Sequence, residues 1–282
     1  MIEHHNRKLF ASPMIFTFLP KLLLVLALFC ITSFFLLEVS AQINVFTAET
    51  MRQLNQETGF YNKARIDFTY HSGNSVTQTF NLRYRTDYMR SNYHLFAVND
   101  FQVRSKDSTT FINRGMVHGR SIWSIKPRQM LEAFGQKQFN QSLLLKDRSL
   151  LGGGLRFKLF NQSPNKTSSN LDVYFGVGAM WEHEKIQDVG WDPLVTNLIR
   201  STNYISLNYA VSDQSMLGIT TYYQVNLTNQ KDFRVLTEAN LNYQFTNRVQ
   251  AFTSLNSRYD NEPPQNLVFH DLQINNGIIL SF

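Results

Sequence analysis

A polar and charged block in the middle of the chain has the clearest potential for chemistry. Glu132, Gln136 and Gln138 stand on one side of an alternating segment, and Arg148 and Arg156 do so in the next segment. Residues of equal parity share one face of a β-strand, so Glu132 comes near Arg156 if both faces point inward. A buried charge is costly unless it is paired. We therefore predict that these five residues form an ion-pair network in a lumen, which holds the strands in register and makes removal of Glu132 harmful to folding. The alternative is that the same charges line an ion path or bind a solute.

Nucleophilic catalysis has less support. A hydrolase site needs a serine, a histidine within hydrogen-bond reach and a third group that orients the histidine. No histidine after residue 41 stands in a His-x-Ser arrangement, which would put both side chains on one strand face. These histidines are His71, His94, His118, His183 and His270. We therefore predict no enzymatic activity and no cofactor, and a lipid-modifying enzyme is the least favoured alternative.

One acidic cluster, Glu182-His183-Glu184 with Asp188 and Asp192 further along, could attract a cation. We expect it in a long solvent-exposed connection at 183–199. The alternative is a divalent cation that links this loop to lipopolysaccharide. No spacing matches a structural zinc site or a calcium loop, so no metal site is predicted.

The elements that position these groups are β-strands with two different faces. From residue 63 onward, apolar and polar residues alternate in segments of roughly ten residues, the length of a tilted membrane-crossing strand. Strands in a soluble β-sandwich average about five or six residues, so that alternative fits less well. Only 17% of the chain is charged, against about 25% in a soluble domain. Aromatic residues near strand ends suit the two membrane interfaces; they are Tyr70, Tyr88, Trp123, Trp181, Tyr204 and Tyr259.

The fold class predicted from this pattern is all-β: a transmembrane antiparallel up-and-down β-barrel of about 12 strands. Turn residues such as Ser72-Gly73-Asn74-Ser75 separate the strands. The longer connections, which we expect on the outer side, fall at 104–110, 140–147, 183–199, 228–232 and 261–266. The inner side then carries short turns, apart from a longer connection at 161–169.

The N-terminal segment is typical of a secretory signal peptide. Basic residues precede an apolar run at 22–37, and Val39-Ser40-Ala41 supplies the small-residue exit. The run is shorter than the roughly twenty residues of a spanning helix, although an uncleaved anchor is the alternative. We predict cleavage between Ala41 and Gln42. The domains are then a signal peptide at 1–41, a short periplasmic N-terminal segment at 42–62 and a barrel domain at 63–282.

The composition limits the partners. Cys30, the single cysteine, lies in the leader, so no disulfide is expected. The net charge of +6 is spread along the chain without a Lys/Arg run, and no nucleic-acid partner is predicted. We expect contact with outer-membrane lipid and lipopolysaccharide; soluble partners stay unassigned.

The chain ends on an alternating apolar strand, LQINNGIILSF, with Phe282 as its last residue. Such an exposed edge invites aggregation, but in a closed barrel the last strand pairs with the first and no edge is left. A terminal Phe also resembles the C-terminal signal by which barrel proteins are recognised for outer-membrane insertion. That resemblance implies contact with the barrel-assembly machinery.

Several short motifs carry a family resemblance. Residues 132–140 (EAFGQKQFN) are followed by Leu145, Arg148 and LGGGL at 151–155, and the ends contribute Ser72-Gly73-Asn74 and Asn276-Gly277-Ile278. Together they resemble the family catalogued as domain of unknown function 481, with its YdiY-like, "salt-induced" outer membrane proteins, over roughly residues 60 to 282. The resemblance implies an outer-membrane β-barrel of a Gram-negative bacterium and supplies no catalytic residues.

Two non-enzymatic functions follow from these observations. The leading hypothesis is a barrel that acts as a narrow pore, with small conductance or none, or as an envelope-stress component. The second hypothesis is a structural or docking barrel that acts through its outer loops.

Overall fold

The computed structural model describes residues 58–71, 77–106, 109–161, 171–187, 194–263 and 268–282, which form twelve strands. The strands are β1 (Gly59–His71), β2 (Thr77–Arg90), β3 (Tyr93–Lys106), β4 (Thr109–Lys126), β5 (Gln129–Asn140), β6 (Leu145–Asn161), β7 (Leu171–Ile186), β8 (Leu194–Ala210), β9 (Ser215–Asn226), β10 (Phe233–Gln244), β11 (Val249–Asp260) and β12 (His270–Ser281). A 3-10 turn, η2 (Gln141–Leu143), lies between β5 and β6. In the part of the chain described, no helix is both long and apolar enough to cross a bilayer.

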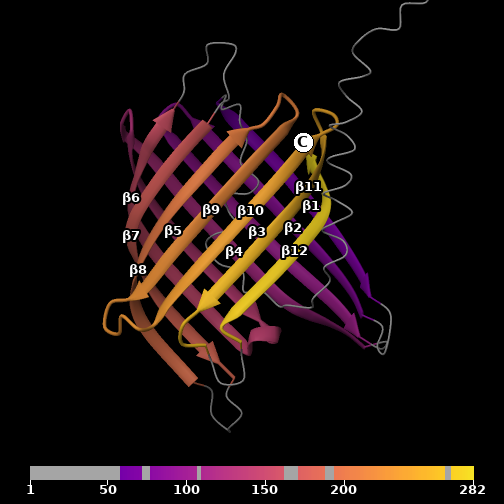
Figure 1. Cartoon of the computed structure of the whole chain (residues 1–282), viewed down its shortest axis with the longest axis vertical. Coiled ribbons are helices and arrows are strands. Elements are labelled where there is room, and N and C mark those ends of the chain that lie inside the picture. The colour runs from indigo at the N-terminus through magenta and orange to yellow at the C-terminus, as the bar shows by residue number, and fades with distance from the viewer. Residues whose placement is uncertain (1–57, 72–76, 107–108, 162–170, 188–193, 264–267) are drawn as a thin grey trace, which may run out of the picture. The chain divides into compact units, whose positions relative to one another are not determined.

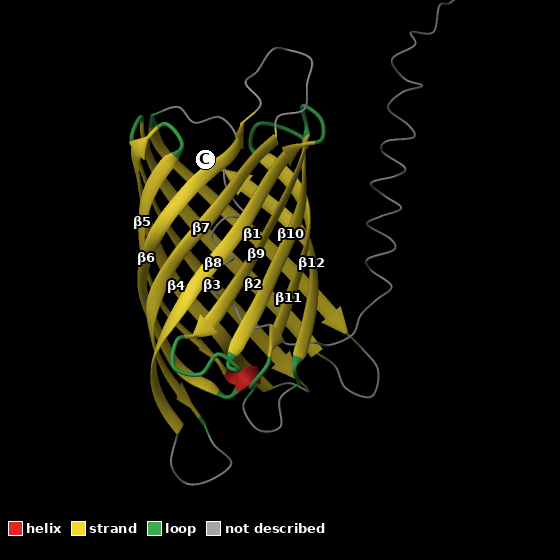
Figure 2. Ribbon diagram, turned by 60° about the vertical axis from the view of Figure 1, so that its left-hand side comes forward, coloured by secondary structure: helices red, strands yellow, loops and turns green. Residues whose placement is uncertain are grey.

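The strands close into a barrel. Each strand pairs antiparallel with its neighbours in the chain, and β1 pairs with β12. Figures 1 and 2 show the strands running obliquely around this barrel. The predicted all-β, antiparallel, up-and-down architecture of about 12 strands is thus confirmed. We call the end where β1 begins and β12 ends the near end, and the opposite end the far end.

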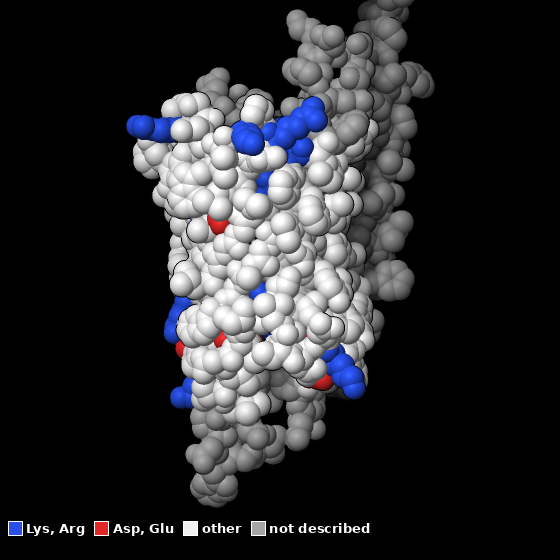
Figure 3. All heavy atoms as spheres, turned by 90° about the vertical axis from the view of Figure 1, so that its left-hand side faces the viewer, with Lys and Arg blue, Asp and Glu red and all other residues white. Residues whose placement is uncertain are grey.

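The apolar rows of the strands face outward. Phe68 is 60% exposed, Leu151 65% and Val177 42%, whereas the residues between them point into the barrel and are buried. Figure 3 shows one side of the barrel, where charged side chains gather toward the two ends. An apolar band between two polar rims is the outer surface of a membrane barrel.

Aromatic pairs lie on the exterior at both ends of this band. Near-end examples are Phe60 with Tyr88, whose ring centroids are 4.5 Å apart, and Tyr93 with Trp123 at 5.8 Å. At the far end, Phe233 contacts both Tyr223 and Tyr259 at 5.8 Å. These rows match the two interfacial girdles of a membrane barrel.

The prediction that Tyr204 lies among the aromatic residues at the membrane interface is wrong. Tyr204 is only 4% exposed and lies inside the barrel. Its even position places it on the inner face of β8, together with Arg200 and Thr202, which are also buried. The outward row of the same strand is the odd one, with Ile205 51% exposed.

The element bounds correct several predictions. β1 begins at Gly59, so strand structure starts before residue 63. The connection predicted at 183–199 is shorter, because β7 continues to Ile186 and β8 begins at Leu194. The signal peptide, the Ala41–Gln42 cleavage site and most of the predicted connection at 161–169 lie outside the described residues.

The ladder between β1 and β12, which we call the seam, is short. It joins four residue pairs, from Lys63↔Ser281 to Ile66↔Ile278, while β1 pairs with β2 along its whole length. Two backbone hydrogen bonds between Asn62 and Phe282 extend the seam at the near end. A Cβ on Gly277 would lie 2.5 Å from the carbonyl oxygen of Ile66, so this glycine allows the close approach of β1.

Candidate functional site in the barrel lumen

The interior of the barrel is densely charged. Among the described residues, eleven Lys and Arg and ten Asp and Glu are buried. The five most deeply buried arginines, all with less than 2% exposure, come from β2, β4, β6 and β8; they are Arg85, Arg120, Arg148, Arg156 and Arg200. A buried ion is stable only when it is paired and hydrogen-bonded. The nearly equal numbers of buried cations and carboxylates therefore allow these charged side chains to be buried together in the lumen.

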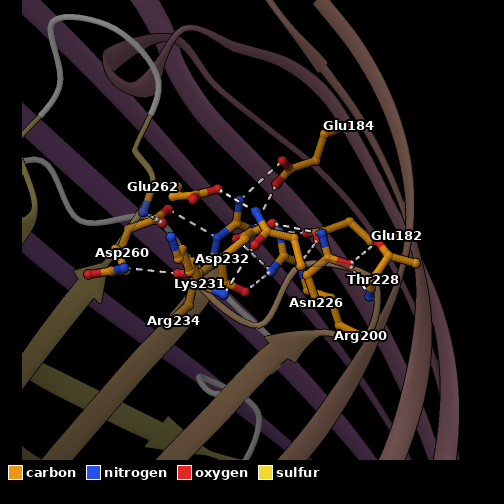
Figure 4. Close-up of polar contacts among 12 residues, drawn as sticks. Glu182, Glu184, Arg200, Asn226, Thr228, Lys231, Asp232, Arg234, Asp260 and Glu262 are labelled. Carbon is orange, nitrogen blue, oxygen red and sulfur yellow. Dashed lines mark hydrogen bonds and ion pairs between the residues drawn. The ribbon is translucent and has the colours of Figure 1, made fainter.

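The largest group of ion pairs lies toward the far end, and we call it the far-end charge cluster. Its members are Arg148, Glu182, Glu184, Arg200, Asp232, Arg234, Arg258, Asp260 and Asp271. Figure 4 shows six of these residues and their dashed contacts. They come from six strands, β6, β7, β8, β10, β11 and β12, and from the connection between β9 and β10.

Glu182 is the centre of this cluster. It accepts hydrogen bonds or ion pairs from Arg148, Arg200 and Arg234, the last at 3.0 Å, and its side chain is fully buried. Arg234 also pairs with Glu184 at 3.1 Å and with Asp260 at 3.0 Å. Because β7 and β10 are separated by β8 and β9 in the barrel, the contacts of Arg234 cross part of the lumen.

Asp232 fixes the connection between β9 and β10 to the same cluster. The guanidinium of Arg200 donates to both oxygens of its carboxylate, at 2.8 and 2.7 Å. Asn226 donates to Asp232 Oδ2 at 3.2 Å. A bidentate arginine–carboxylate pair is strong and geometrically specific, so this connection is held at the mouth of the lumen (Figure 4).

A second set of contacts crosses the middle of the lumen. Arg120 on β4 donates to the Tyr222 hydroxyl on β9 at 3.2 Å, and four strands separate the two. Glu132 on β5 accepts from the Tyr204 hydroxyl on β8 at 3.0 Å. Arg120 Nη1 lies 3.7 Å from Glu132 Oε2. These four residues therefore join nearly opposite walls of the barrel.

The three charged residues of the sequence-derived network lie in or beside these two sets of contacts. Glu132 lies opposite Gly154, so Arg156 is its diagonal neighbour, and its closest described contacts are Tyr204 and Arg120. Arg156 stacks over Tyr174, 4.2 Å from the ring centroid. Arg148 belongs to the far-end charge cluster.

The two glutamines form a separate group on β5. Gln136 donates to Gln138 at 2.7 Å and contacts His118 Nδ1 at 3.0 Å. His118 and Arg120, which share a face of β4, are both 1% exposed. All five residues of the predicted network are buried in the lumen, and their joining into one network stays a prediction.

Glycines on β6 and β7 make room for the aromatic rings in this interior. A Cβ on Gly176 would lie 2.0 Å from Tyr204 Cε1, and one on Gly152 would lie 2.5 Å from the Phe134 ring. A cavity of about 10 Å³, near the size that holds one water molecule, is left beside these rings. Its walls include Arg120, Glu132 and Tyr204.

Charged pairs also line the side formed by β1 to β3. Arg83 donates to Asp100 at 2.6 Å, and Arg85 pairs with Asp87 at 2.6 Å. His94 contacts the same Asp87 oxygen at 2.7 Å. Arg65 donates to Ser254 at 2.7 Å on β11, across the seam from β1.

The acidic motif was misread from the sequence. Glu182 and Glu184 are buried in β7, 0% and 3% exposed, rather than solvated in a loop. Their inward parity, shared with Met180, could have indicated this. Asp188 and Asp192 lie outside the described residues, and within the described ones no group of three or more acidic, histidine or cysteine side chains could hold a metal ion.

Arg200, Asp232, Arg234, Arg258 and Asp260 were not singled out from the sequence at all. Parity would have marked Arg200 and Arg234 as inward charges. Their partners depend on the tilt of the strands, which a sequence does not give.

Comparison with known proteins identifies a family. The family model described as "Protein of unknown function, DUF481" matches residues 64–282. None of the curated proteins matches the chain. Among solved structures, the NanC porin covers 78% of this chain and 98% of its own, with 9% identity and a TM-score of 0.46.

Two other barrels are similar at the same level. The COG4313 outer membrane channel from Pseudomonas putida F1 covers 80% of this chain and 96% of its own, with 12% identity and a TM-score of 0.46. The translocator domain of the autotransporter NalP from Neisseria meningitidis covers 84% and 92%, with 11% identity and a TM-score of 0.45. At these identities the likeness concerns the fold alone.

Proposed function

Because this chain belongs to the DUF481 family of proteins of unknown function, we propose its function from its own lumen: it is a narrow outer-membrane channel that cross-lumen contacts hold nearly closed. The outer membrane is the location that fits an apolar exterior with aromatic residues at both ends. In this proposal the charged interior is the path of the ions, and the contacts of Arg120 and of Arg234 form two constrictions along it.

A single observation carries the proposal. Arg120 reaches Tyr222 from a strand on the other side of the barrel, and both side chains are 1% exposed. Arg234 makes a second crossing from β10 to Glu182 and Glu184. A twelve-strand barrel has limited interior width, so side chains that bridge it reduce the path for water and ions.

The charges set the expected behaviour of this path. Arginine at a constriction repels cations and favours the passage of anions. We therefore expect small conductance steps in the native protein and a weak preference for anions, since the buried cations exceed the buried carboxylates by one.

The test is planar-bilayer conductance of the purified, folded protein. The variant Arg120→Ala/Arg234→Ala removes both crossings and should raise the single-channel conductance several-fold. The matched control, Arg83→Ala/Arg85→Ala, removes two buried arginines whose ion pairs stay within one strand or between adjoining strands, and it should leave the conductance close to the native value.

Folding of each variant is checked by the heat-dependent gel shift of a closed barrel. If a folded Arg120→Ala/Arg234→Ala variant conducts no more than the control, the crossings are not the constriction and the channel assignment fails. The function would then have to be sought in the connections at the far end.

A further inference from the structure

The exterior of β5, β6 and β7 changes character abruptly near the far end. Leu151 and Trp181, which are paired across β6 and β7, are 65% and 41% exposed. The next outward pair toward the far end is Ser149 and His183, and the one after it is Asp147 and Lys185. The apolar band therefore ends at Trp181, the kind of residue that lies at the level of lipid headgroups.

Three lysines stand just beyond this boundary, and we call them the far-end lysine patch: Lys137, Lys146 and Lys185. Lys137 and Lys146 are exposed and Lys185 is half-buried. Asp147 is the carboxylate among them: Lys137 Nζ lies 2.8 Å from it, and Lys185 is its cross-strand neighbour. Counted over these four described side chains, the patch has an excess of two positive charges at headgroup level.

The neighbouring side chains complete a polar shelf. Lys137 also donates to Ser149 at 3.2 Å. His183 stacks on Trp181, with ring centroids 6.0 Å apart, and its Nδ1 contacts Asn197 at 2.9 Å. Hydroxyl, amide and imidazole groups therefore lie beside the ammonium groups and above an apolar wall.

The patch has no counterpart among the outward strand residues of β9 to β12. At the same end of β9 to β12, the outward strand residues that the structure describes include no Lys or Arg; they are Tyr223, Val225, Phe233, Val235, Ser257, Tyr259, His270 and Leu272. Lys231, an exposed cation at the same end, lies in the β9–β10 connection and not on a strand. Outward cations on the strands therefore distinguish β5 to β7 from β9 to β12, as expected for a ligand that approaches from the side of the barrel.

The far end carries the connections β5–β6, β7–β8, β9–β10 and β11–β12, which the sequence predicts to lie on the outer side of the membrane. We infer that the far-end lysine patch binds the phosphate groups of a lipid headgroup in the outer leaflet, the phosphorylated glycolipid of the outer membrane. Ammonium groups are effective phosphate binders, and basic residues at a membrane surface attract anionic lipids. The acyl chains of such a lipid would lie along Leu151 and Trp181. This inference does not depend on whether the lumen conducts.

The experiment is native mass spectrometry of the full-length protein in a neutral detergent with diphosphoryl lipid A as the probe. The variant Lys137→Gln/Lys146→Gln/Lys185→Gln should lose at least about tenfold in affinity. The control Lys126→Gln/Arg128→Gln/Arg248→Gln removes three exposed cations at the near end and should bind like the native protein. Replacing the three patch lysines by Arg should restore binding, which separates lost charge from altered folding.

Two further arms identify the ligand chemistry. Dephosphorylated lipid A should bind the native protein no better than it binds the Gln variant, and excess inorganic phosphate should not displace the phosphorylated lipid. Equal affinity of the native protein and the Gln variant for diphosphoryl lipid A would overturn the inference. An equal loss of affinity in the near-end control variant would overturn it too. Displacement by free phosphate would overturn it as well, because the site would then recognise a soluble anion.

Discussion

At the scale of single residues, the lumen depends on a few carboxylates that serve several arginines each. Glu182 contacts three guanidinium groups and is fully buried. Breaking a buried pair by removing one partner leaves an uncompensated charge, which is more damaging than never having had the pair. The central acidic residues should therefore be far more sensitive to substitution than acidic residues at the rim.

The first prediction concerns Glu182→Gln. It should lower the free energy of unfolding by about 3–5 kcal/mol, because Arg148, Arg200 and Arg234 would lose their shared carboxylate. Urea unfolding in detergent, followed by the gel shift, measures the change. Glu262→Gln is the control, since this exposed side chain accepts one hydrogen bond from Asn229, and it should change stability by less than about 0.5 kcal/mol. Similar losses in both variants would contradict the central role of Glu182.

The sequence identified inward charge at some of these positions but not the partners. Glu132 was expected near Arg156, which is its diagonal neighbour on β6, and the sequence did not indicate its contacts with Tyr204 and Arg120. Alternation along a strand specifies which face a residue occupies. It does not specify which residue of a distant strand lies at the same height, because tilt and stagger decide that.

At the scale of elements, inward-facing glycines on β6 and β7 leave space into which bulky side chains of other strands pack. Gly152 lies under Phe134 and Gly176 under Tyr204. The glycine-rich run at 152–154 can be read from the sequence as space for large side chains. The rings that use this space were not, because Tyr204 was assigned to the exterior although its parity matches the inward residues of β8.

The second prediction compares two glycines on strands. Gly176→Ala should cost about 1–3 kcal/mol of stability, since the added methyl meets a ring that the Glu132 hydrogen bond holds in place. Gly119→Ala places its methyl where no atom lies within 4 Å and should be neutral or stabilising by about 0.5–1 kcal/mol.

A double-mutant cycle distinguishes a steric conflict from a general intolerance of alanine. In the background of Tyr204→Ala, the cost of Gly176→Ala should largely disappear, because residues in contact are not additive. An unchanged cost in that background would mean that Tyr204 is not the obstacle. Heat and urea unfolding of the four proteins supply the measurement.

At the scale of the whole molecule, closure is uneven. The seam pairs four residues, whereas β11, a strand of the same length as β12, pairs with eleven residues on each side. The sequence predicted that the last strand pairs with the first, which is correct. The extent of that pairing could not be predicted, because it depends on the stagger accumulated over all the strands.

The third prediction concerns hydrogen exchange of the folded protein in detergent. Backbone amides of residues 270–276 in β12 should exchange faster than those of β11, because fewer of them are held between two partner strands and local opening there is less costly. Mass spectrometry of peptides from the two strands gives the comparison. Equal protection of β11 and β12 would show that the seam is as stable as the other ladders.

The short seam also determines how the molecule should respond to force. A pull on the C-terminal end loads the few rungs between β12 and β1 before it loads the long ladders of β6, β7 and β8, so we expect the barrel to peel from its last strand. The force needed to unfold the protein would then be set by the seam between β1 and β12. The contacts across the lumen would instead resist compression of the barrel wall.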